Sequence, residues 1–332
     1  MEESSITQSN VIMRRSIYTF LQNYHYFTTT AAILAFPYSI SILLSQFSVP
    51  YSPLLPAIHA RLEAMFMAAE FPSSSKLFSV LGFKISQTLS SSIFALPFTL
   101  SFFLLSKASV IRLLKRHNPT SSPPPSFSSI LPLYKPLFST FVCNLFLLLA
   151  ANSTAFSILF FGFFSSSPNW VTFMSAAGAV VYSIILANAI IVCNLALVCS
   201  GMEKSGGYMA ILKACVLIKG RTLTALALAV PGNLALAAIE ALFHYRVVCR
   251  AYGGAGGGDF NGFWMGLEGV LIAYLYSILV VFDSVVSSMF FKSCKIRGLV
   301  DDQEGRCCYQ IEIVADKDGN GYVKLKNIEE FP

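Results

Sequence analysis

The chain has 332 residues, of which 55% are hydrophobic, 12% are charged and 14% are aromatic, with a mean hydropathy of +0.64 and a formal net charge of +6. A water-soluble domain carries about twice that share of charged residues, so the composition excludes a pair of ordinary soluble domains. The predicted fold class is an all-α membrane protein with six transmembrane helices, both termini in the cytoplasm, short interfacial helices and a small cytoplasmic tail containing a β-hairpin.

The first 27 residues form a mixed polar stretch that lacks the pattern of a signal peptide, and we predict a cytoplasmic N-terminal segment here. Beyond it, six stretches of about 20 or more residues carry few or no charges, enough to cross about 30 Å of hydrocarbon. Together they predict a membrane domain over residues 28–291. The predicted spans are 28–47, 85–106, 139–163, 171–199, 222–243 and 266–291.

The distribution of Lys and Arg predicts the orientation, because these residues are retained on the cytoplasmic side during insertion. Most of the 23 cationic residues fall in the N-terminal segment, the loop 107–136, the connection between spans four and five, and the tail 292–332. Both termini are therefore predicted to be cytoplasmic, in the plasma membrane or the endomembrane system.

Between spans one and two, apolar residues recur at helical spacing within the segment 48–77. This pattern predicts a short helix that lies on the membrane or caps the bundle. The loop 107–136 starts with a basic run and continues into a Pro- and Ser-rich linker. Its basic run and the connection between spans four and five supply the cations expected to contact anionic headgroups: Arg112, Lys115, Arg116, Lys213 and Lys219.

Polar residues inside the spans are the candidates for a functional site, because charge within a membrane is costly. Asp283 lies deepest and is the best candidate for an ion or proton contact, with a structural hydrogen bond or a water-filled vestibule as the alternatives. Glu240 and Glu268 are expected near the non-cytoplasmic ends of spans five and six, and Asn188 and Asn194 could assist Asp283.

Cys199 and Cys294 lie at the cytoplasmic boundary and are candidate palmitoylation sites, with free buried thiols as the alternative. In the tail, the segment 316–323 resembles the start of a calcium loop, with Asp316, Asp318 and Asn320 as candidate ligands. Position twelve is Asn327, where a bidentate Glu is required. A β-hairpin with its turn at residues 319–321 is therefore favoured over a calcium site.

The connection between spans four and five carries Gly201-Met202-Glu203-Lys204, Gly207, Ala210, Lys213 and Leu217-Ile218-Lys219-Gly220-Arg221. This pattern resembles a family of plant multi-pass membrane proteins of unknown function, and more distantly bacterial six-span membrane domains. The resemblance implies the architecture but no catalytic residue.

Motifs for zinc proteases, phosphate-binding loops and serine nucleophiles are missing from the sequence, so we expect neither enzyme activity nor a cofactor. The predicted function is a non-enzymatic membrane scaffold or regulator that contacts anionic lipids, with protein partners at the tail and no nucleic acid. The alternative is a small-solute or ion transporter that uses Asp283.

Overall fold

The structure is a computed structural model that describes residues 2–49, 52–68, 76–115, 127–164, 171–252, 259–303, 309–315 and 321–327. The helices in chain order are α1 (Glu2–Gln22), α2 (Tyr24–Thr30), α3 (Phe36–Ser48), α4 (Leu54–Ala68), α5 (Lys76–Phe98), α6 (Leu104–Lys115), α7 (Phe127–Phe164), α8 (Val171–Glu203), α9 (Tyr208–Ile218), α10 (Thr222–Phe243), α11 (Cys249–Tyr252) and α12 (Asp259–Gln303). Three π-helical turns join consecutive helices: η1 (Ala31–Ala35), η3 (Thr99–Phe103) and η5 (His244–Val248). Strands β1 (Tyr309–Ala315) and β2 (Gly321–Asn327) pair antiparallel.

Within the described residues, six helical segments are long and apolar enough to cross a membrane. They are Tyr24–Ser48, Ile85–Lys115, Ile130–Ala155, Val180–Glu203, Thr222–Val248 and Phe263–Lys295. The number of spans agrees with the prediction, and the protein is an integral membrane protein by this criterion. The third span starts earlier than predicted because Pro132 and Pro136 lie inside α7 rather than before it. Membrane helices tolerate such prolines when neighbouring groups satisfy the freed backbone.

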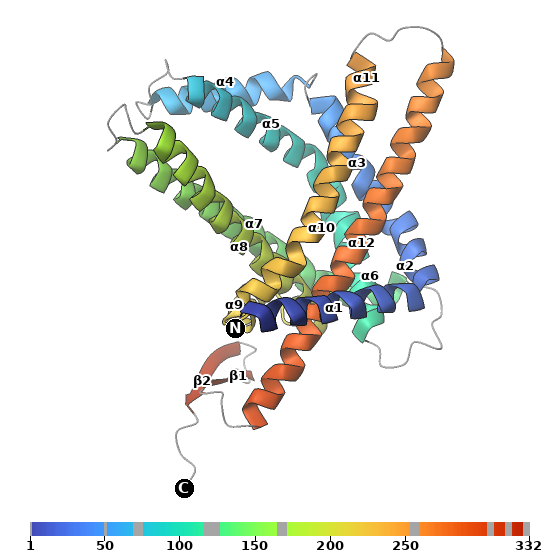
Figure 1. The fold of residues 1–332 in the computed structure, drawn as a ribbon, viewed down its shortest axis with the longest axis vertical. Coiled ribbons are helices and arrows are strands. Elements are labelled where there is room, and N and C mark those ends of the chain that lie inside the picture. The colour runs from blue at the N-terminus through green and yellow to red at the C-terminus, as the bar shows by residue number, and fades with distance from the viewer. Residues whose placement is uncertain are drawn as a thin grey trace.

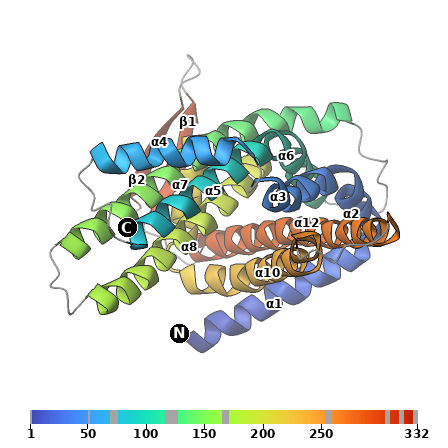
Figure 2. The ribbon, with the colours of Figure 1, turned by 90° about the horizontal axis from the view of Figure 1, so that it is seen from above.

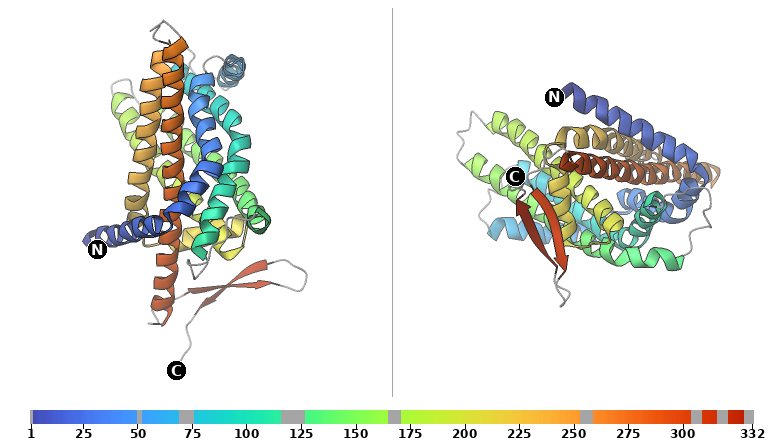
Figure 3. Two further views of the ribbon diagram at one scale, coloured as in Figure 1. Left: turned by 90° about the vertical axis from the view of Figure 1, so that its right-hand side faces the viewer. Right: turned by 90° about the horizontal axis from the view of Figure 1, so that it is seen from below.

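The predicted fold class is wrong in including a β-hairpin tail in the architecture. The folded body consists of helices, whereas β1 and β2 follow the end of α12 and lie apart from the bundle (Figure 3). A two-stranded ribbon without a further strand or helix to pack on is only marginally stable, so it does not define a fold. Most of the predicted N-terminal segment forms the long helix α1.

The bundle is arranged around two helix pairs. Helices α7 and α8 pack along each other, as do α10 and α12, and the pairs converge near α9 and diverge toward α4 and α11 (Figure 1). We call these two ends of the bundle the α9 end and the α4 end. Helix α1 crosses the α9 end beside α10 and α12 (Figure 2).

Helix α12 is the central helix of the bundle. Half of the residues in its apolar window (50%) are buried inside the protein, against 17–22% for the second to fifth spans. Its inward face carries small polar residues, Ser277, Ser284 and Ser288, each of which donates its hydroxyl to a carbonyl of the same helix. Small side chains of this kind let membrane helices approach closely.

The connection between α8 and α9 is tightly packed. A Cβ added at Gly206 would lie 2.8 Å from the Pro136 Cα of α7, and Gly207 has a φ of 73°. The Gly207 amide donates a hydrogen bond of 2.9 Å to the Thr140 hydroxyl. Glycine is required at both positions, at Gly206 by the close approach of a backbone and at Gly207 by the left-handed conformation.

Candidate functional site

Lys107 lies inside the bundle and not in a loop, because α6 continues for two more turns after it. Its side chain is 1% exposed, and its ammonium donates a hydrogen bond of 3.3 Å to the Asn194 Oδ1 of α8. The ammonium also lies 4.9 Å from the centre of the Phe103 ring, in the range of a cation–π contact. The predicted loop 107–136 therefore starts too early, and its first cation belongs to the membrane domain.

Asp283 of α12 is the acidic partner in this region, close enough to Lys107 for the two charges to interact. Among the described residues the two groups do not form a direct ion pair, and the hydrogen bond of Lys107 goes to Asn194. We call Lys107, Asn194 and Asp283 the polar centre. Asp283 and Asn194 both line a cavity of about 40 Å³ between α8, α10 and α12.

Gly232 gives the Asp283 carboxylate an open side toward α10. A Cβ added at Gly232 would lie 3.5 Å from the Asp283 Oδ1, so a larger side chain here would cover the carboxylate. In the described part of the chain, the Asp283 side chain makes no direct hydrogen bond. The half-buried carboxylate is thus an acceptor that faces a small cavity, as a binding site for a cation or a hydrogen-bond donor requires.

A second polar group lies on the α4 side of the polar centre. The Tyr276 hydroxyl of α12 donates a hydrogen bond of 3.0 Å to Glu240 Oε1 of α10, and the Gln46 amide of α3 lies 3.4 Å from Glu240 Oε2. We call these three residues the Glu240 cluster. The Tyr38 hydroxyl of α3 is within electrostatic reach of both Glu240 and Asp283.

Glu268 belongs to a separate group at the α4 end. Its carboxylate pairs with Arg246 at 2.5 Å and with Arg250 at 3.6 Å. These side chains are between 25% and 55% exposed, so the pairs contribute little net stability. The structure therefore does not bring Glu268 together with Glu240, although the sequence predicts both near the same end of the bundle.

Asn188 lines a lateral groove of about 390 Å³ between α8 and α10. The groove is bordered by Val180, Ser183, Ile184, Ala187 and Asn188 of α8 and by Leu226 of α10. Asn194 is on the same helix closer to the α9 end, so the two asparagines predicted to assist Asp283 occupy different hollows.

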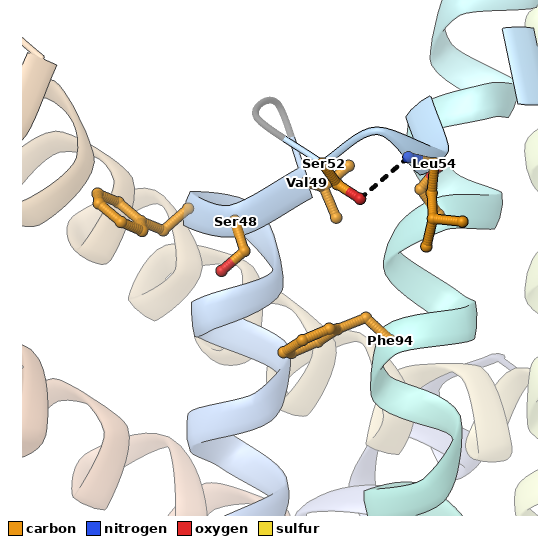
Figure 4. A pocket seen from close by; sticks show the side chains of 7 residues that line it. Ser48, Val49, Ser52, Leu54 and Phe94 are labelled. Atoms are coloured by element: carbon orange, nitrogen blue, oxygen red, sulfur yellow. Dashed lines mark hydrogen bonds between the residues drawn. The ribbon is translucent and has the colours of Figure 1, made fainter. Parts of the chain in front are cut away.

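Another cavity, of about 610 Å³, lies between α3, α4 and α5 (Figure 4). Its lining is apolar apart from serines, and Ser52 accepts a hydrogen bond of 3.2 Å from the Leu54 amide. Charged and other titratable side chains are missing from the described lining, so this cavity offers no acid–base or ion chemistry.

At the α9 end, cations predicted to contact headgroups bind protein groups instead. Glu203 accepts hydrogen bonds from Lys213 at 2.7 Å and from Lys295 at 3.2 Å, and Lys115 donates to the Met202 carbonyl at 2.6 Å. Lys292 likewise donates to the Leu114 carbonyl at 2.5 Å. Lysines at helix C-termini satisfy carbonyls that the helix leaves unpaired, so these cations tie α6, α8, α9 and α12 together.

The remaining predicted headgroup cations have different positions. Lys219 is exposed at the C-terminus of α9, and Arg112 is half-buried on α6. Arg116 lies outside the described residues, as do the candidate calcium ligands Asp316, Asp318 and Asn320. Within the ranges that the structure describes, no three His, Cys, Asp or Glu side chains are grouped to hold a metal ion.

Both candidate palmitoylation sites are buried, each with 2% exposure. An acyltransferase needs an accessible thiol, so this structure favours the alternative that Cys199 and Cys294 are packing residues. Cys215 and Cys249 are the exposed thiols among the described cysteines, and they lie on α9 and α11.

Sequence reasoning identified Asp283 and Asn194 but missed Lys107 and Tyr38. Lys107 follows an apolar run and begins a run of cations, a pattern that is typical of a loop. The signal that could have placed it is the continuation of apolar residues at helical spacing after it, at Val110, Ile111 and Leu114, all of which are buried.

A family model described as a domain of unknown function, DUF8558, matches residues 5–297. The match includes every described residue of the polar centre, the Glu240 cluster and the lateral groove. The chain matches no curated protein. It matches no solved structure either. Since the family model covers most of the chain, the protein belongs to the DUF8558 family of unknown function.

Proposed function

We propose that the protein is a membrane transporter for ions or small cationic solutes, and that Asp283 contacts the transported cation. The observation that supports this most is the position of Asp283 within the membrane-spanning part of α12, where it lines a cavity between three helices. Ionisable residues within a membrane are rare, and those that face a cavity between helices mark ion and solute pathways.

A purely structural ion pair explains the polar centre less well. A buried ion pair repays the cost of desolvation only when its geometry is excellent and its other hydrogen bonds are made. Here Lys107 donates to Asn194, while Asp283 keeps an acceptor on the cavity side. In our proposal, Lys107 supplies the counter-charge when the site is empty and weakens cation binding enough to allow release.

The Glu240 cluster and Tyr38 extend this proposal toward the α4 end. They place a second carboxylate and two hydroxyl groups between Asp283 and that side of the membrane. The π-helical turns η1 and η3 directly precede the helices that carry Tyr38 and Lys107. Such turns occur frequently at functional sites in membrane and soluble proteins.

The scaffold hypothesis has weaker support. It depends on cations that are free to contact lipid headgroups, whereas Lys115 and Lys213 bind a carbonyl and a carboxylate of the protein. Lys219 remains exposed for such a contact. Three expectations from the sequence remain predictions: that the protein is not an enzyme, that it has no cofactor, and that it is similar to plant membrane proteins.

Replacing Asp283 by asparagine is expected to lower cation currents by about 10- to 100-fold, because the charge-assisted contact to the cation is lost. The measurement uses proteoliposomes on a solid-supported membrane, with concentration jumps of protons, Na⁺, K⁺ and methylammonium. The matched control is Glu63→Gln, which removes an exposed carboxylate of α4 and should leave the currents unchanged. Currents no larger than those of protein-free liposomes for all four cations, with folded wild-type protein, would refute the transporter proposal.

We propose further that the α9 end faces the cytoplasm, which makes both termini cytoplasmic. The support is the concentration of Lys and Arg at this end, on α1, α9 and the C-terminal parts of α6 and α12. We also propose, from the sequence alone, that the protein resides in the plasma membrane or the endomembrane system.

Two exposed thiols test the orientation. In sealed right-side-out vesicles, a membrane-impermeant maleimide should label Cys249 and spare Cys215 until the vesicles are permeabilised. Partial burial raises the pKa of the Cys215 thiol, which lowers its thiolate fraction at a given pH, so its labelling should also be slower. If sealed vesicles of the Cys249→Ser variant were labelled and those of Cys215→Ser were not, the α9 end would face outward, opposite to the proposal.

A further inference from the structure

The lateral groove between α8 and α10 and the cavity at Asp283 are neighbours along these two helices. Ala187 and Asn188 of the groove are one turn from Ile191 of the cavity along α8, and Leu226 of the groove follows Ala225 of the cavity on α10. The groove therefore ends about one helical turn from the cavity along α8, and both hollows are lined by residues of α8 and α10.

The walls of the groove match an aliphatic chain. Val180 and Ile184 of α8 are 59% and 56% exposed, and Leu226 of α10 is 38% exposed, so apolar side chains on both walls are uncovered within the membrane-spanning segments. At this depth the surrounding solvent is hydrocarbon. A molecule that reaches the groove sideways from the bilayer would therefore have an apolar body.

The cavity at the other end selects the head group by charge and by size. Asp283 lines the cavity, whereas Lys107 does not, so the cavity presents a carboxylate and favours a cation over an anion. Its volume of about 40 Å³ has room for an ammonium or a few water-sized groups, since one water needs about 10–15 Å³ on this measure. A phosphodiester head group is too large and has the wrong charge.

The cavity favours a small cationic head group, and the groove favours an apolar chain. We therefore infer that the ligand of this site is a lipophilic amine. Its aliphatic chain would lie in the groove between α8 and α10, and its ammonium would bind Asp283, beside Asn194 and Ser287. This inference rests on the proposed transport function, and it specifies the class of cation that the site takes.

Photocrosslinking tests the inference by binding, without a transport readout. The probe is a long-chain primary alkylamine with a diazirine in the middle of the chain, added to the purified full-length protein in phosphatidylcholine nanodiscs. Crosslinks should map to α8 between residues 180 and 188 and to Leu226. Asp283→Asn should reduce their yield by about 10- to 100-fold, since it removes a charge-assisted contact. A probe with a hydroxyl in place of the amine should label these positions weakly and regardless of Asp283.

A groove-filling variant separates this inference from the transport proposal. Ile184→Trp should block the crosslink but leave the currents of small inorganic cations in place, because Asp283 is unchanged. The matched control is Val181→Trp, at an exposed position of α8 outside the groove lining, which should leave the crosslink intact. The inference would be overturned if the amine and hydroxyl probes labelled equally, or if labelling survived Asp283→Asn. Either result would show that the groove holds ordinary lipid or another chain, even with intact cation currents. Loss of all currents with retained Asp283-dependent labelling would instead refute transport.

Discussion

Replacing Lys107 by methionine is expected to lower the free energy of unfolding by about 1–3 kcal/mol, the usual cost of leaving a buried hydrogen-bonding group without its partner. Methionine matches the length of the lysine stem but leaves the Asp283 carboxylate without a cation and the Asn194 oxygen without a donor. The measurement is unfolding of the purified protein by titration with a denaturing detergent, followed by the loss of helical circular dichroism.

The double variant Lys107→Met with Asp283→Asn should recover a large part of this loss, because neither charge then remains buried. Coupled residues of this kind show interaction free energies of about 0.5–3 kcal/mol. Lys135→Met is the matched control, on α7, where the lysine is exposed and should contribute little. Additive effects of the two single substitutions would show that Lys107 and Asp283 are independent and would remove the electrostatic basis of the polar centre.

Replacing Gly206 by alanine is expected to destabilise the protein by about 1–3 kcal/mol, in the range found for inserting a methyl group into a packed site. The added Cβ would lie 2.8 Å from the Pro136 Cα and 2.9 Å from its carbonyl oxygen. These are backbone atoms of α7, so relief requires a helix to shift and not merely a side chain to rotate. The measurement is the thermal unfolding temperature in detergent.

Gly266→Ala serves as the comparison for Gly206→Ala. Gly266 lies within α12, and an added Cβ there would meet nothing within 4 Å. Alanine is a better helix former than glycine by up to about 1 kcal/mol, so this variant should hold or raise the unfolding temperature. Equal effects of the two substitutions would contradict the close contact between the α8–α9 connection and α7.

The six spans could be predicted from the sequence because hydropathy over about 20 residues is a local property that the bilayer thickness imposes. The spans end elsewhere than predicted where the pattern is ambiguous. Prolines suggest a helix start at Pro136, yet α7 continues through it. A helix was not predicted in the polar N-terminal segment, yet α1 forms there with Ile12 and Ser16 buried.

The candidate site was predictable only in part. Asp283 and Asn194 stand out because a polar residue in an apolar run is visible without any knowledge of packing. Lys107 became recognisable only through its tertiary neighbours, since Asn194 is 87 residues away in the chain. The lateral groove could not be predicted either, because the mostly aliphatic residues that line it form a groove only through the packing of α8 and α10.

The serine hydroxyls of α12 have a mechanical consequence. Ser277, Ser284 and Ser288 donate to carbonyls of their own helix, so these bonds travel with α12 when it moves. Among the described residues, the hydrogen bonds that join α12 to other helices occur up to Tyr276 and again from Lys292 onward. Within the described residues, the intervening segment makes no hydrogen bond to another helix, and its Asp283 interacts with Lys107 through charge. A movement of this segment would therefore rearrange apolar contacts and the Lys107–Asp283 interaction without breaking a hydrogen bond between described helices.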